Sequence, residues 1–514
     1  MKRKMILVLC FLLLIGMTAF AAGKQEVKKI AIRWTDIPEA LEDVENGDFM
    51  KALYAKFPEV TFKLEPMMYS AMPEKMPVLM ASGDMPDILS TSTSTYLPQL
   101  VEGKLIAPLD DALKAVGKDL LGNARDGQLA LGVFMGKQYA VPNSYSLKWF
   151  TQMIRMDWLD KLGLKVPVTM DEFREVARAF TLKDPDGNGK QDTYGTAFRA
   201  NVNFIDSFFL AYGVASSHHQ IGMWRIRGGK QTFDWVQPQM KEALMNLASW
   251  YKEGLIDPES LTYDWNNWYA KLLQSKFGMW YHQQGRLNEV NSSLVKAGFP
   301  NAKMWPIDPP KGPYGQGTFN EGQPWGKVFA ARNLNKAIEV YNYTATQEFY
   351  LASKGEAIAA YPTKPDVTGP NGWPVYYTAN EAATDPNYET RRKHFLYSAI
   401  GSTMSHLENP NMYKTWPNQD LAKYLWQSYL NTMGPAQVAG NEKSEKWAQT
   451  TSKPVPVPAD AKYFVNLQTA FREMCTKIVS GKDADSTWND WIKFYNANGG
   501  PEIEAQVNQL MPAK

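Results

Sequence analysis

The sequence predicts an α/β protein made of more than one globular unit. Short runs rich in β-branched and aromatic residues alternate with helical patterns, which is typical of parallel strands joined by helices. The chain has 514 residues, and a single hydrophobic core rarely serves so many, so we expect two or three units with separate cores. Hydrophobic residues make up 44% of the chain and charged residues 21%, a composition that indicates a globular protein and excludes collagen-like structure.

The first predicted elements follow one another closely along the chain. In order, we expect a strand at 30–34, a helix at 49–56, a strand at 60–64, a helix at 76–81 and a strand at 86–89. The second of these helices is followed by a turn at Ser82-Gly83-Asp84. This order of strands and helices is the evidence for the α/β class.

The pattern changes near residue 140. Residues 136–142 predict a hairpin that leads into a crossing segment. Thr169 and Glu172 have the spacing of a capping box and predict the start of a helix. Residues 239–254 have helical apolar spacing, and the remainder of the chain is mostly helical apart from an extended, proline-rich segment at 453–458.

The amino-terminal residues predict a secretory signal peptide, 1–21. Three basic residues precede an apolar run at 5–20, and Ala19-Phe20-Ala21 forms a cleavage signature. The alternative is a membrane anchor, but this run is shorter than the roughly 20 residues that a spanning helix needs. Cys10 lies inside the apolar run and not at its end, so we expect a periplasmic or otherwise extracytoplasmic protein without a lipid anchor.

The mature chain carries almost no net charge and many amphipathic rings. From 55 basic and 53 acidic residues, cleavage removes three basic ones, and a balanced chain has no field suited to nucleic acid. The 17 tryptophans and 25 tyrosines predict a surface on which a ligand stacks, since both residue types combine an apolar ring with a polar group. Cys475 is the one cysteine left, so the mature chain has no internal disulfide.

Residues 184–195 predict a structural calcium site. Side-chain oxygens at loop positions 1, 3, 5 and 9, a backbone carbonyl at position 7 and glycine at position 6 match an EF-hand loop. The predicted ligands are Asp184, Asp186, Asn188, Lys190 through its carbonyl, and Asp192. Position 12 is Gly195, where an EF-hand has glutamate, so either another carboxylate such as a bidentate Asp192 completes the shell or binding is weak. The alternative is an ordinary surface turn.

No catalytic motif is found in the chain. The phosphate-binding loop, the nucleophile elbow, the zinc-protease motif and the dinucleotide fingerprint are all missing. Of the five histidines, His218 and His219 alone are close in sequence. Carboxylate pairs for glycoside hydrolysis remain open, because the separation they need is spatial.

Several segments, taken in order, resemble one protein family. They are residues 81–88, 103–110, 136–142, 159–164, 169–173, 251–258 and 278–280, with 478–482 and 488–500 near the end. These segments resemble family 1 of the extracellular solute-binding proteins of ABC transporters, and in particular the large alginate-oligosaccharide-binding and LplA/LipO-like branch. Thr193 departs from the alginate binders, which place a further acidic ligand there, so alginate itself is not inferred.

The resemblance implies a type II-like periplasmic-binding-protein fold of two α/β lobes, each a sheet flanked by helices, with a ligand cleft between them. Lobe 1 is expected at 22–142 plus 310–398, and lobe 2, with the calcium loop and the helical carboxyl-terminal region, at 143–309 plus 399–514. The implied function is a monomeric receptor, not an enzyme, that captures an oligosaccharide, with or without uronate, by lobe closure and delivers it to a membrane permease. The alternatives are a secreted carbohydrate-active enzyme and a receptor for peptides or another solute.

In this family the ends of the first strands and the crossing segments face the ligand. For lobe 1 the expected binding residues are Trp34, Asp36, Ser90, Thr91, Tyr96, Asn143 and Tyr145. For the far lobe and the returning segments they are Arg199, Asn203, Trp265, Trp280, Tyr281, Gln283, Trp325 and Trp373. Four arginines near these segments are candidates for pairing with uronate carboxylates, namely Arg33, Arg155, Arg199 and Arg286. Any of these rings can instead fill the core.

Overall fold

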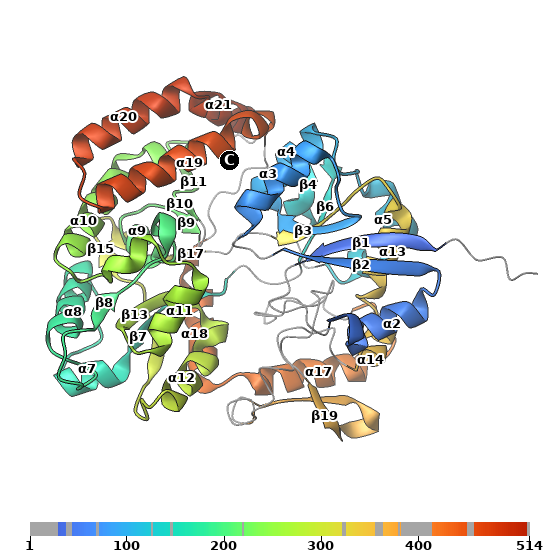
Figure 1. Ribbon diagram of the computed structural model, residues 1–514, viewed down its shortest axis with the longest axis horizontal. Helices are drawn as coiled ribbons and strands as arrows, with labels where there is room; N and C mark the ends of the chain where they lie inside the picture. Colours follow the sequence, from blue (N-terminus) through green and yellow to red (C-terminus); the bar gives the residue numbers. More distant parts are fainter. Residues whose placement is uncertain are drawn as a thin grey trace, which may run out of the picture.

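Two α/β lobes lie side by side in a computed structural model of the protein (Figure 1). The structure describes residues 29–36, 44–67, 71–124, 127–143, 148–217, 220–320, 325–354, 363–378, 381, 414–449 and 457–510. The expected signal peptide, Tyr145, the His218-His219 pair and most of the segment 453–458 lie outside the described residues. No helix among the described residues combines the length and the apolar character that crossing a membrane requires.

The first lobe is built on a five-stranded sheet. Its strand order is β2 (Val60–Pro66), β1 (Ile30–Asp36), β3 (Ile88–Ser92), β18 (Trp325–Phe329) and β6 (Ala140–Pro142). The helices of this lobe are α2 (Asp48–Lys56), α3 (Met72–Ser82), α4 (Thr93–Glu102), α5 (Asp110–Val116), α6 (Lys118–Gly122), α13 (Leu334–Tyr343), α14 (Gln347–Ala352) and α17 (Gln419–Thr432), which was expected in the second lobe. The expected strands and helices of the first 90 residues are therefore confirmed, with boundaries shifted by a few residues.

The second lobe contains a four-stranded sheet in the order β14 (Met304–Ile307), β7 (Phe150–Arg155), β13 (Phe277–Gln283) and β8 (Tyr194–Thr196). Around it lie α7 (Met156–Leu162), α8 (Met170–Leu182), α9 (Asp206–Ala211), α10 (Pro238–Lys252), α11 (Trp265–Leu273), α12 (Leu287–Lys296), α18 (Pro435–Trp447), α19 (Pro458–Val479), α20 (Ala484–Ala497) and α21 (Gly500–Leu510). The capping box of α8 is confirmed, since Glu172 N donates to Thr169 Oγ1 at 3.2 Å and Thr169 N donates to Glu172 Oε2 at 3.0 Å.

Short strand pairs complete the structure. They are β4 (Val133–Phe134) with β5 (Lys137–Gln138), β9 (Ser216–Ser217) with β10 (Gln220–Ile221), β11 (Trp224–Arg227) with β12 (Lys230–Phe233), β15 (Lys311–Gly312) with β16 (Gly315–Gln316), β17 (Phe319–Asn320) with β21 (Ala448–Gln449), and β19 (Thr363–Thr368) with β20 (Pro374–Tyr376). The first of these pairs is the hairpin that the sequence predicts near residue 136.

The two main sheets are mixed, which corrects the expectation of parallel strands. β1 is parallel to β2 and β3, and β13 is parallel to β8. However, β18 is antiparallel to β3, and β7 is antiparallel to β13. β7 and β18 are the first strands of their sheets after the chain crosses from the other sheet, so no helical crossover within one sheet requires them to be parallel.

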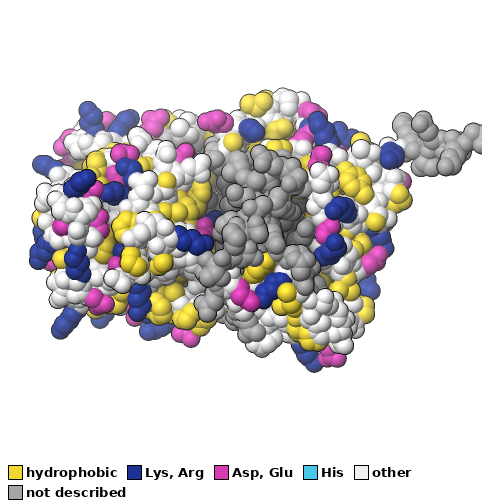
Figure 2. Space-filling model, turned by 60° about the horizontal axis from the view of Figure 1, so that its bottom comes forward, with side chains coloured by type: hydrophobic (Ala, Val, Ile, Leu, Met, Phe, Trp, Pro, Cys, Tyr) yellow, Lys and Arg dark blue, Asp and Glu magenta, His cyan; other side chains and the backbone are white. Residues whose placement is uncertain are grey.

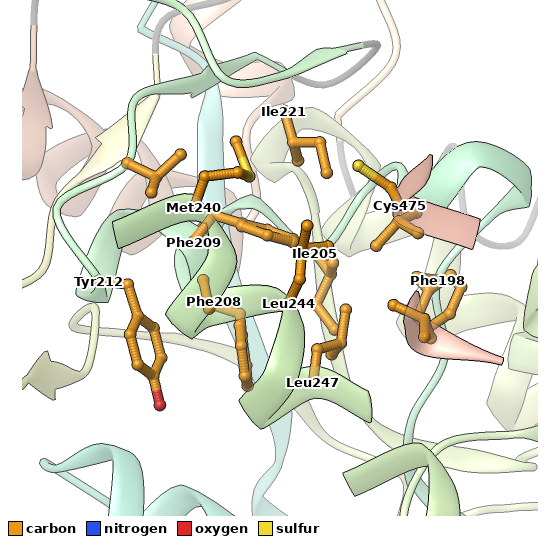
Figure 3. Close-up of a cluster of buried hydrophobic side chains, with 14 of the residues drawn as sticks. Phe198, Ile205, Phe208, Phe209, Tyr212, Ile221, Met240, Leu244, Leu247 and Cys475 are labelled. Atoms are coloured by element: carbon orange, nitrogen blue, oxygen red, sulfur yellow. The ribbon is translucent and has the colours of Figure 1, made fainter. Parts of the chain in front are cut away.

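Each lobe has its own buried core, and a third cluster joins them. The core of the second lobe includes aromatic side chains of α9, aliphatic side chains of α10 and Cys475 of α19 (Figure 3). Cys475 is fully buried, as expected for a small packed side chain, and burial raises the pKa of its thiol. The third cluster combines Met72 and Leu89 of the first lobe with Phe150 and Trp268 of the second.

Candidate functional site

A buried ion pair holds three of the predicted binding residues together in the first lobe. Asp36 Oδ2 lies 2.9 Å from Lys327 Nζ, and both side chains are 0% exposed. Trp34 Nε1 donates to Asp36 Oδ2 at 3.1 Å, and Lys327 Nζ donates to Ser90 Oγ at 3.2 Å. The neighbouring strands β1, β3 and β18 carry these residues, so the sheet brings the four side chains to one place.

Trp34 occupies the core of the first lobe in this structure. Its ring is 0% exposed and packs edge-on against Phe49 and Tyr341, with ring centroids 6.2 and 6.0 Å away. The ring therefore has no free face here, and its polar group is used inside the protein by Asp36.

Four further predicted residues lie on or near the carboxyl end of strand β3 in the same sheet. Thr91 is fully buried, with its hydroxyl 3.9 Å from Met72 Sδ. Asn143 N donates to Trp325 O at 2.7 Å, and the Trp325 side chain is largely buried. Tyr96 is 9% exposed on α4, which packs against α19 of the second lobe. Burial raises the pKa of Tyr96, while the charge of Arg472 on α19 acts in the opposite direction.

The second lobe carries a dense group of arginine and aromatic side chains. We call it the arginine–aromatic cluster, and it consists of Arg199, Phe204, Trp265, Tyr269, Trp280, His282 and Arg286. These residues come from the segments that follow β8, from α11, and from β13 and its end. β8 and β13 are parallel, so their carboxyl ends lie at one edge of the sheet, where ligands bind in open α/β sheets.

Ring stacking orders this cluster. Trp265 stacks on Tyr269 with centroids 4.8 Å apart and an interplanar angle of 15°. His282 lies between Trp280, at 4.6 Å and 1°, and Phe204, at 5.1 Å and 15°. Trp280 is 0% exposed, whereas Trp265 keeps part of its surface exposed. Of the stacked tryptophans, Trp265 is therefore the one that is not fully buried.

Two guanidinium groups flank Trp265. Arg286 Cζ lies 4.7 Å from the centroid of the Trp265 ring, and Arg199 Cζ lies 5.9 Å from it and 4.7 Å from the centroid of Phe204. Arg286 also forms an ion pair with Glu289 at 3.1 Å. Burial lowers the pKa of Arg199 to about 10, and the negative charge of Asp264 acts in the opposite direction.

The other predicted residues of the second lobe and the returning segments are spread out. The backbone groups of Asn203 and Arg199 exchange hydrogen bonds of 2.9 and 3.1 Å. Tyr281 is buried and stacks on Phe150 with centroids 5.8 Å apart, and Gln283 at the end of the same strand is half-buried. Trp373 is not brought to either group, because it packs on Tyr424 of α17 (Gln419–Thr432) with ring centroids 5.2 Å apart.

Sequence reasoning missed Lys327, Phe204, Tyr269, His282 and Glu289, which the structure places among the predicted residues. One signal for Lys327 was available. It is a charged residue inside the otherwise uncharged strand segment 325–329, and a charge in such a strand needs a partner when the strand is central.

A surface hollow of the first lobe contains no residue of the Asp36–Lys327 network and none of the arginine–aromatic cluster. This hollow of 630 Å³ is lined by Asp110, Leu113, Lys114, Lys118, Leu121, Gly122, Leu129 and Gln138. Elsewhere on the surface, basic and acidic side chains are interspersed over both lobes on the face seen in Figure 2. That face has no concentration of one sign of charge, in agreement with the balanced composition.

The predicted calcium loop forms a tight turn in which oxygen side chains converge. Asp184 Oδ1 accepts hydrogen bonds from Gly187 N at 3.0 Å and Asn188 N at 3.1 Å. The Asn188 amide nitrogen lies 2.9 Å from Asp186 Oδ2 and 3.1 Å from Asp192 Oδ1. The NH2 group of Asn188 thus lies between the two carboxylates. Rotating this amide by 180° would place the Asn188 oxygen at the same position, where it could bind a calcium ion.

The electrostatics of the loop are those of crowded carboxylates. The Gly189 N–H bond lowers the pKa of Asp184, whereas burial raises the pKa of Asp186. Asp192 also forms an ion pair with Lys276. No group of three or more His, Cys, Asp or Glu side chains within the described ranges is arranged to hold a metal ion. The oxygen donors fit calcium by their chemistry, and the third carboxylate is engaged by the Lys276 ammonium.

Sequence comparison identifies relatives of this chain. The family model described as bacterial extracellular solute-binding protein matches residues 41–349. Lipoprotein LipO of Bacillus subtilis (strain 168) is 24% identical over 499 residues, which cover 95% of this chain and 93% of LipO. The fructooligosaccharide ABC transporter substrate-binding protein FusA of Streptococcus pneumoniae is 28% identical over 231 residues, or 40% of this chain and 41% of FusA.

Solved structures share the fold. The crystal structure of the alginate-binding protein AlgQ2 without calcium ion matches with a TM-score of 0.69 and 20% identity, over 93% of this chain and 96% of AlgQ2. FusA in complex with kestose matches with a TM-score of 0.67 and 17% identity, over 94% of this chain and 98% of FusA. A further FusA structure is described as an EF-hand mutant and has a TM-score of 0.68 at 18% identity, over 94% of this chain and 98% of FusA. These likenesses confirm the predicted two-lobed α/β fold.

Proposed function

Because the chain belongs to the family of bacterial extracellular solute-binding proteins, we propose that it is the receptor of an ABC importer which captures an oligosaccharide and delivers it to a membrane permease. The family is one of binding proteins, in agreement with the expectation of a receptor and not an enzyme. Its location is extracytoplasmic. The observation that carries the choice of a sugar is the arginine–aromatic cluster at the carboxyl ends of β8 and β13.

The chemistry of the cluster suits a sugar. A sugar ring has apolar C–H faces that stack on aromatic rings and hydroxyl edges that accept and donate hydrogen bonds. Trp265 is partly exposed, and Arg199 and Arg286 supply donors close to its ring. FusA and AlgQ2, which share the fold, are named for a fructooligosaccharide and for alginate.

The ligand is proposed to bind in a cleft between the lobes, which are residues 22–142 plus 310–398 and residues 143–309 plus 399–514, apart from α17, which packs on the core of the first lobe. The third buried cluster supports this placement, since side chains from both sheets meet in it. Closure of two lobes around a ligand excludes water and is the motion by which such proteins present a solute. Binding energy then favours the closed state, which a permease can recognise.

Among the predicted residues, six that lie near the edges of the two sheets are proposed to touch the sugar. They are Tyr96, Asn143 and Trp325 on the first lobe and Arg199, Trp265 and Gln283 on the second. Trp34, Asp36 and Ser90 are proposed to support this surface from below, since they are buried in one hydrogen-bonded network with Lys327.

We further propose that the protein is exported as a monomer through a signal peptide cleaved after Ala21. The position of Cys10 inside the apolar run is the argument against a lipid anchor. The comparisons give that argument no support, because LipO is named as a lipoprotein.

The test of the function is sugar binding by the purified mature protein. We expect micromolar or tighter binding of an oligosaccharide, measured by tryptophan fluorescence against a panel of neutral and acidic oligomers. Trp265→Ala is expected to weaken this binding by roughly tenfold, because a stacking face is lost. Trp305→Ala is the matched control, since Trp305 is also half-buried with a cation, Lys303, 5.2 Å from its ring centroid, but lies on the edge strand β14.

Three results would contradict this function. Release of shorter sugars from the oligomers would identify a carbohydrate-active enzyme. A thermal-shift response to peptides and not to sugars would identify a receptor for another solute. Equal losses of affinity in Trp265→Ala and Trp305→Ala would place the sugar away from the arginine–aromatic cluster.

Residues 184–195 are proposed to bind a structural calcium ion. Asp184, Asp186, Asn188, Asp192 and the carbonyl of Lys190 would hold it, and the ion would neutralise the crowded carboxylates. Calcium at about 100 times its Kd is expected to stabilise the protein by ~2.7 kcal/mol relative to protein in chelator, measured from thermal unfolding.

Asp186→Asn is expected to remove most of this stabilisation. Asp160→Asn, which changes an exposed aspartate outside the loop, is the control and keeps the calcium response. An identical melting temperature with calcium and with chelator would show that the loop is an ordinary turn.

A further inference from the structure

We propose that Arg199 selects a solute that carries a carboxylate, so that the captured oligosaccharide contains uronate residues. This inference rests on the proposed function as an oligosaccharide receptor and specifies the charge of its ligand. The evidence is the charge environment of the four candidate arginines.

Three of these arginines have carboxylate partners within the protein. Arg33 pairs with Glu65 at 2.8 Å and with Asp84 at 2.6 Å. Arg155 Nη2 pairs with Asp157 at 2.6 Å, and Arg286 pairs with Glu289 at 3.1 Å. Their charges are therefore compensated without a ligand, and a structural role explains each of them.

Arg199 differs from these three in that no described carboxylate forms an ion pair with it. Its Nε atom is also buried without a hydrogen-bond partner among the described residues, although this alone does not separate it from other arginines such as Arg225. The acidic group whose charge acts on it is Asp264. However, the Asp264 carboxylate caps α11, where it accepts a hydrogen bond from Asn267 N at 2.8 Å. Within the described part of the chain, the Arg199 guanidinium is held by the rings of Phe204 and Trp265 and forms no ion pair.

An arginine in this state is prepared for an anionic partner. Burying a cation without a counter-charge is unfavourable, and contact with aromatic faces offsets only part of the loss. A guanidinium that lies against a ring face still has N–H groups in its own plane, and these match the two oxygens of a carboxylate. A ligand carboxylate would thus complete an environment that the protein leaves incomplete.

The Trp265 ring beside Arg199 indicates that the ligand carboxylate belongs to a sugar. Arg199 Cζ is 5.9 Å from the centroid of Trp265, the partly exposed ring to which we assign sugar stacking. In a uronate the carboxylate is attached directly to the sugar ring. A uronate stacked beside Trp265 therefore brings its charge close to Arg199, whereas a neutral sugar leaves this cation uncompensated.

The experiment compares two ligands that differ in charge and little in shape. Calorimetric titration of the mature protein uses trigalacturonate and its fully methyl-esterified form. We expect the acid to bind about 10- to 100-fold more tightly than the ester, the range of a charge-assisted hydrogen bond. Arg199→Gln is expected to remove this preference, and Arg199→Lys to retain part of it, since a point charge lacks the planar fork.

Arg286→Gln is the matched control. Arg286 lies over the same Trp265 ring but has its own carboxylate, Glu289, so its replacement should leave the ratio of the two affinities unchanged. The melting temperature of the ligand-free protein is a second readout. Arg199→Gln is expected to maintain or raise it, because a half-buried charge without an ion pair among the described residues is removed.

The outcomes separate this inference from the proposed function. If the wild type binds ester and acid equally, or if Arg199→Gln keeps the preference, the inference is overturned while the receptor stands. Tighter binding of neutral oligomers than of acidic ones would likewise overturn this inference and leave the receptor function in place. A fall in the ligand-free melting temperature of Arg199→Gln assigns Arg199 a structural role. If no oligosaccharide of either kind binds, the proposed function fails and this inference fails with it.

Discussion

Replacement of Lys327 by methionine is expected to lower the free energy of unfolding by about 3–5 kcal/mol. Lys327 and Asp36 form an ion pair of 2.9 Å in which both side chains are 0% exposed. Methionine has a similar length but no charge, so the variant leaves the Asp36 carboxylate buried without the cation that pairs with it, although the Trp34 indole still donates to it. An uncompensated buried charge is far more unfavourable than the loss of one hydrogen bond. Denaturant unfolding of the mature protein at neutral pH measures the difference.

Two controls define what this measurement means. The double variant Asp36→Asn/Lys327→Met should be less destabilised than Lys327→Met alone, because the orphaned charge is removed together with its partner. Lys56→Met breaks an exposed ion pair with Glu348 at 2.9 Å, and surface pairs of this kind contribute about 0–1 kcal/mol. If Lys327→Met proves as harmless as Lys56→Met, the buried pair does not hold the edge of the first sheet together.

The Asp206 carboxyl is expected to lower the stability of the protein as the pH rises from about 4 to about 7, and Asp206→Asn is expected to remove this contribution. Asp206 begins α9 and is 0% exposed. Burial raises its pKa to about 7, and the hydrogen bond from the Ser216 hydroxyl opposes this rise only in part. Its second oxygen has no hydrogen-bond partner among the described residues. The folded state therefore favours the neutral carboxyl.

The sign of this pH dependence follows from proton binding. An unfolded aspartate has a pKa of about 3.9, so between about pH 4 and pH 7 the folded state binds a proton that the unfolded state does not. Stability falls through this window, and above pH 7 the loss reaches roughly 4 kcal/mol. Asparagine keeps the shape and one acceptor but carries no charge. Asp206→Asn should thus resemble the wild type near pH 4 and be more stable than the wild type at pH 8.

Asp485→Asn is the control for this experiment. Asp485 is 75% exposed and pairs with Lys241 at the surface, so its replacement should shift the stability by a similar small amount at every pH above 5. Thermal unfolding of the three proteins at pH 4, 6 and 8 provides the comparison. A difference between wild type and Asp206→Asn that stays constant with pH would mean that Asp206 is ionised in the folded state.

The predicted and observed folds agree where the determining interactions are local. The capping box at Thr169 and Glu172 joins residues three apart, and it is present as predicted. The strands and helices before residue 90 follow from short-range periodicity and are also present. In contrast, strand direction depends on how the chain returns from the other lobe, and the antiparallel β7 and β18 have no local signature.

Contacts between residues far apart in the sequence likewise determined which lobe α17 packs on. Leu421 and Leu425 of this helix lie in the core of the first lobe, with Trp416 just before it. In Figure 1 the helix runs beside α14 of that lobe. Residues 399–514 were expected in the second lobe on resemblance alone, and periodicity cannot tell which of two apolar surfaces a helix covers.

For the candidate site, the sequence by itself determined that Trp34, Asp36 and Ser90 lie on the first strands, because strand formation follows from local periodicity. Arg199, shortly after β8, and Trp265, which begins α11, were expected at the site from the family resemblance. Only the tertiary structure decided what these residues do there. It brought Lys327 to Asp36 from 291 positions along the chain, and it supplied carboxylates to Arg33, Arg155 and Arg286 but not to Arg199 among the described residues. Burial and charge pairing depend on neighbours in space, and distant segments become neighbours only when the chain folds.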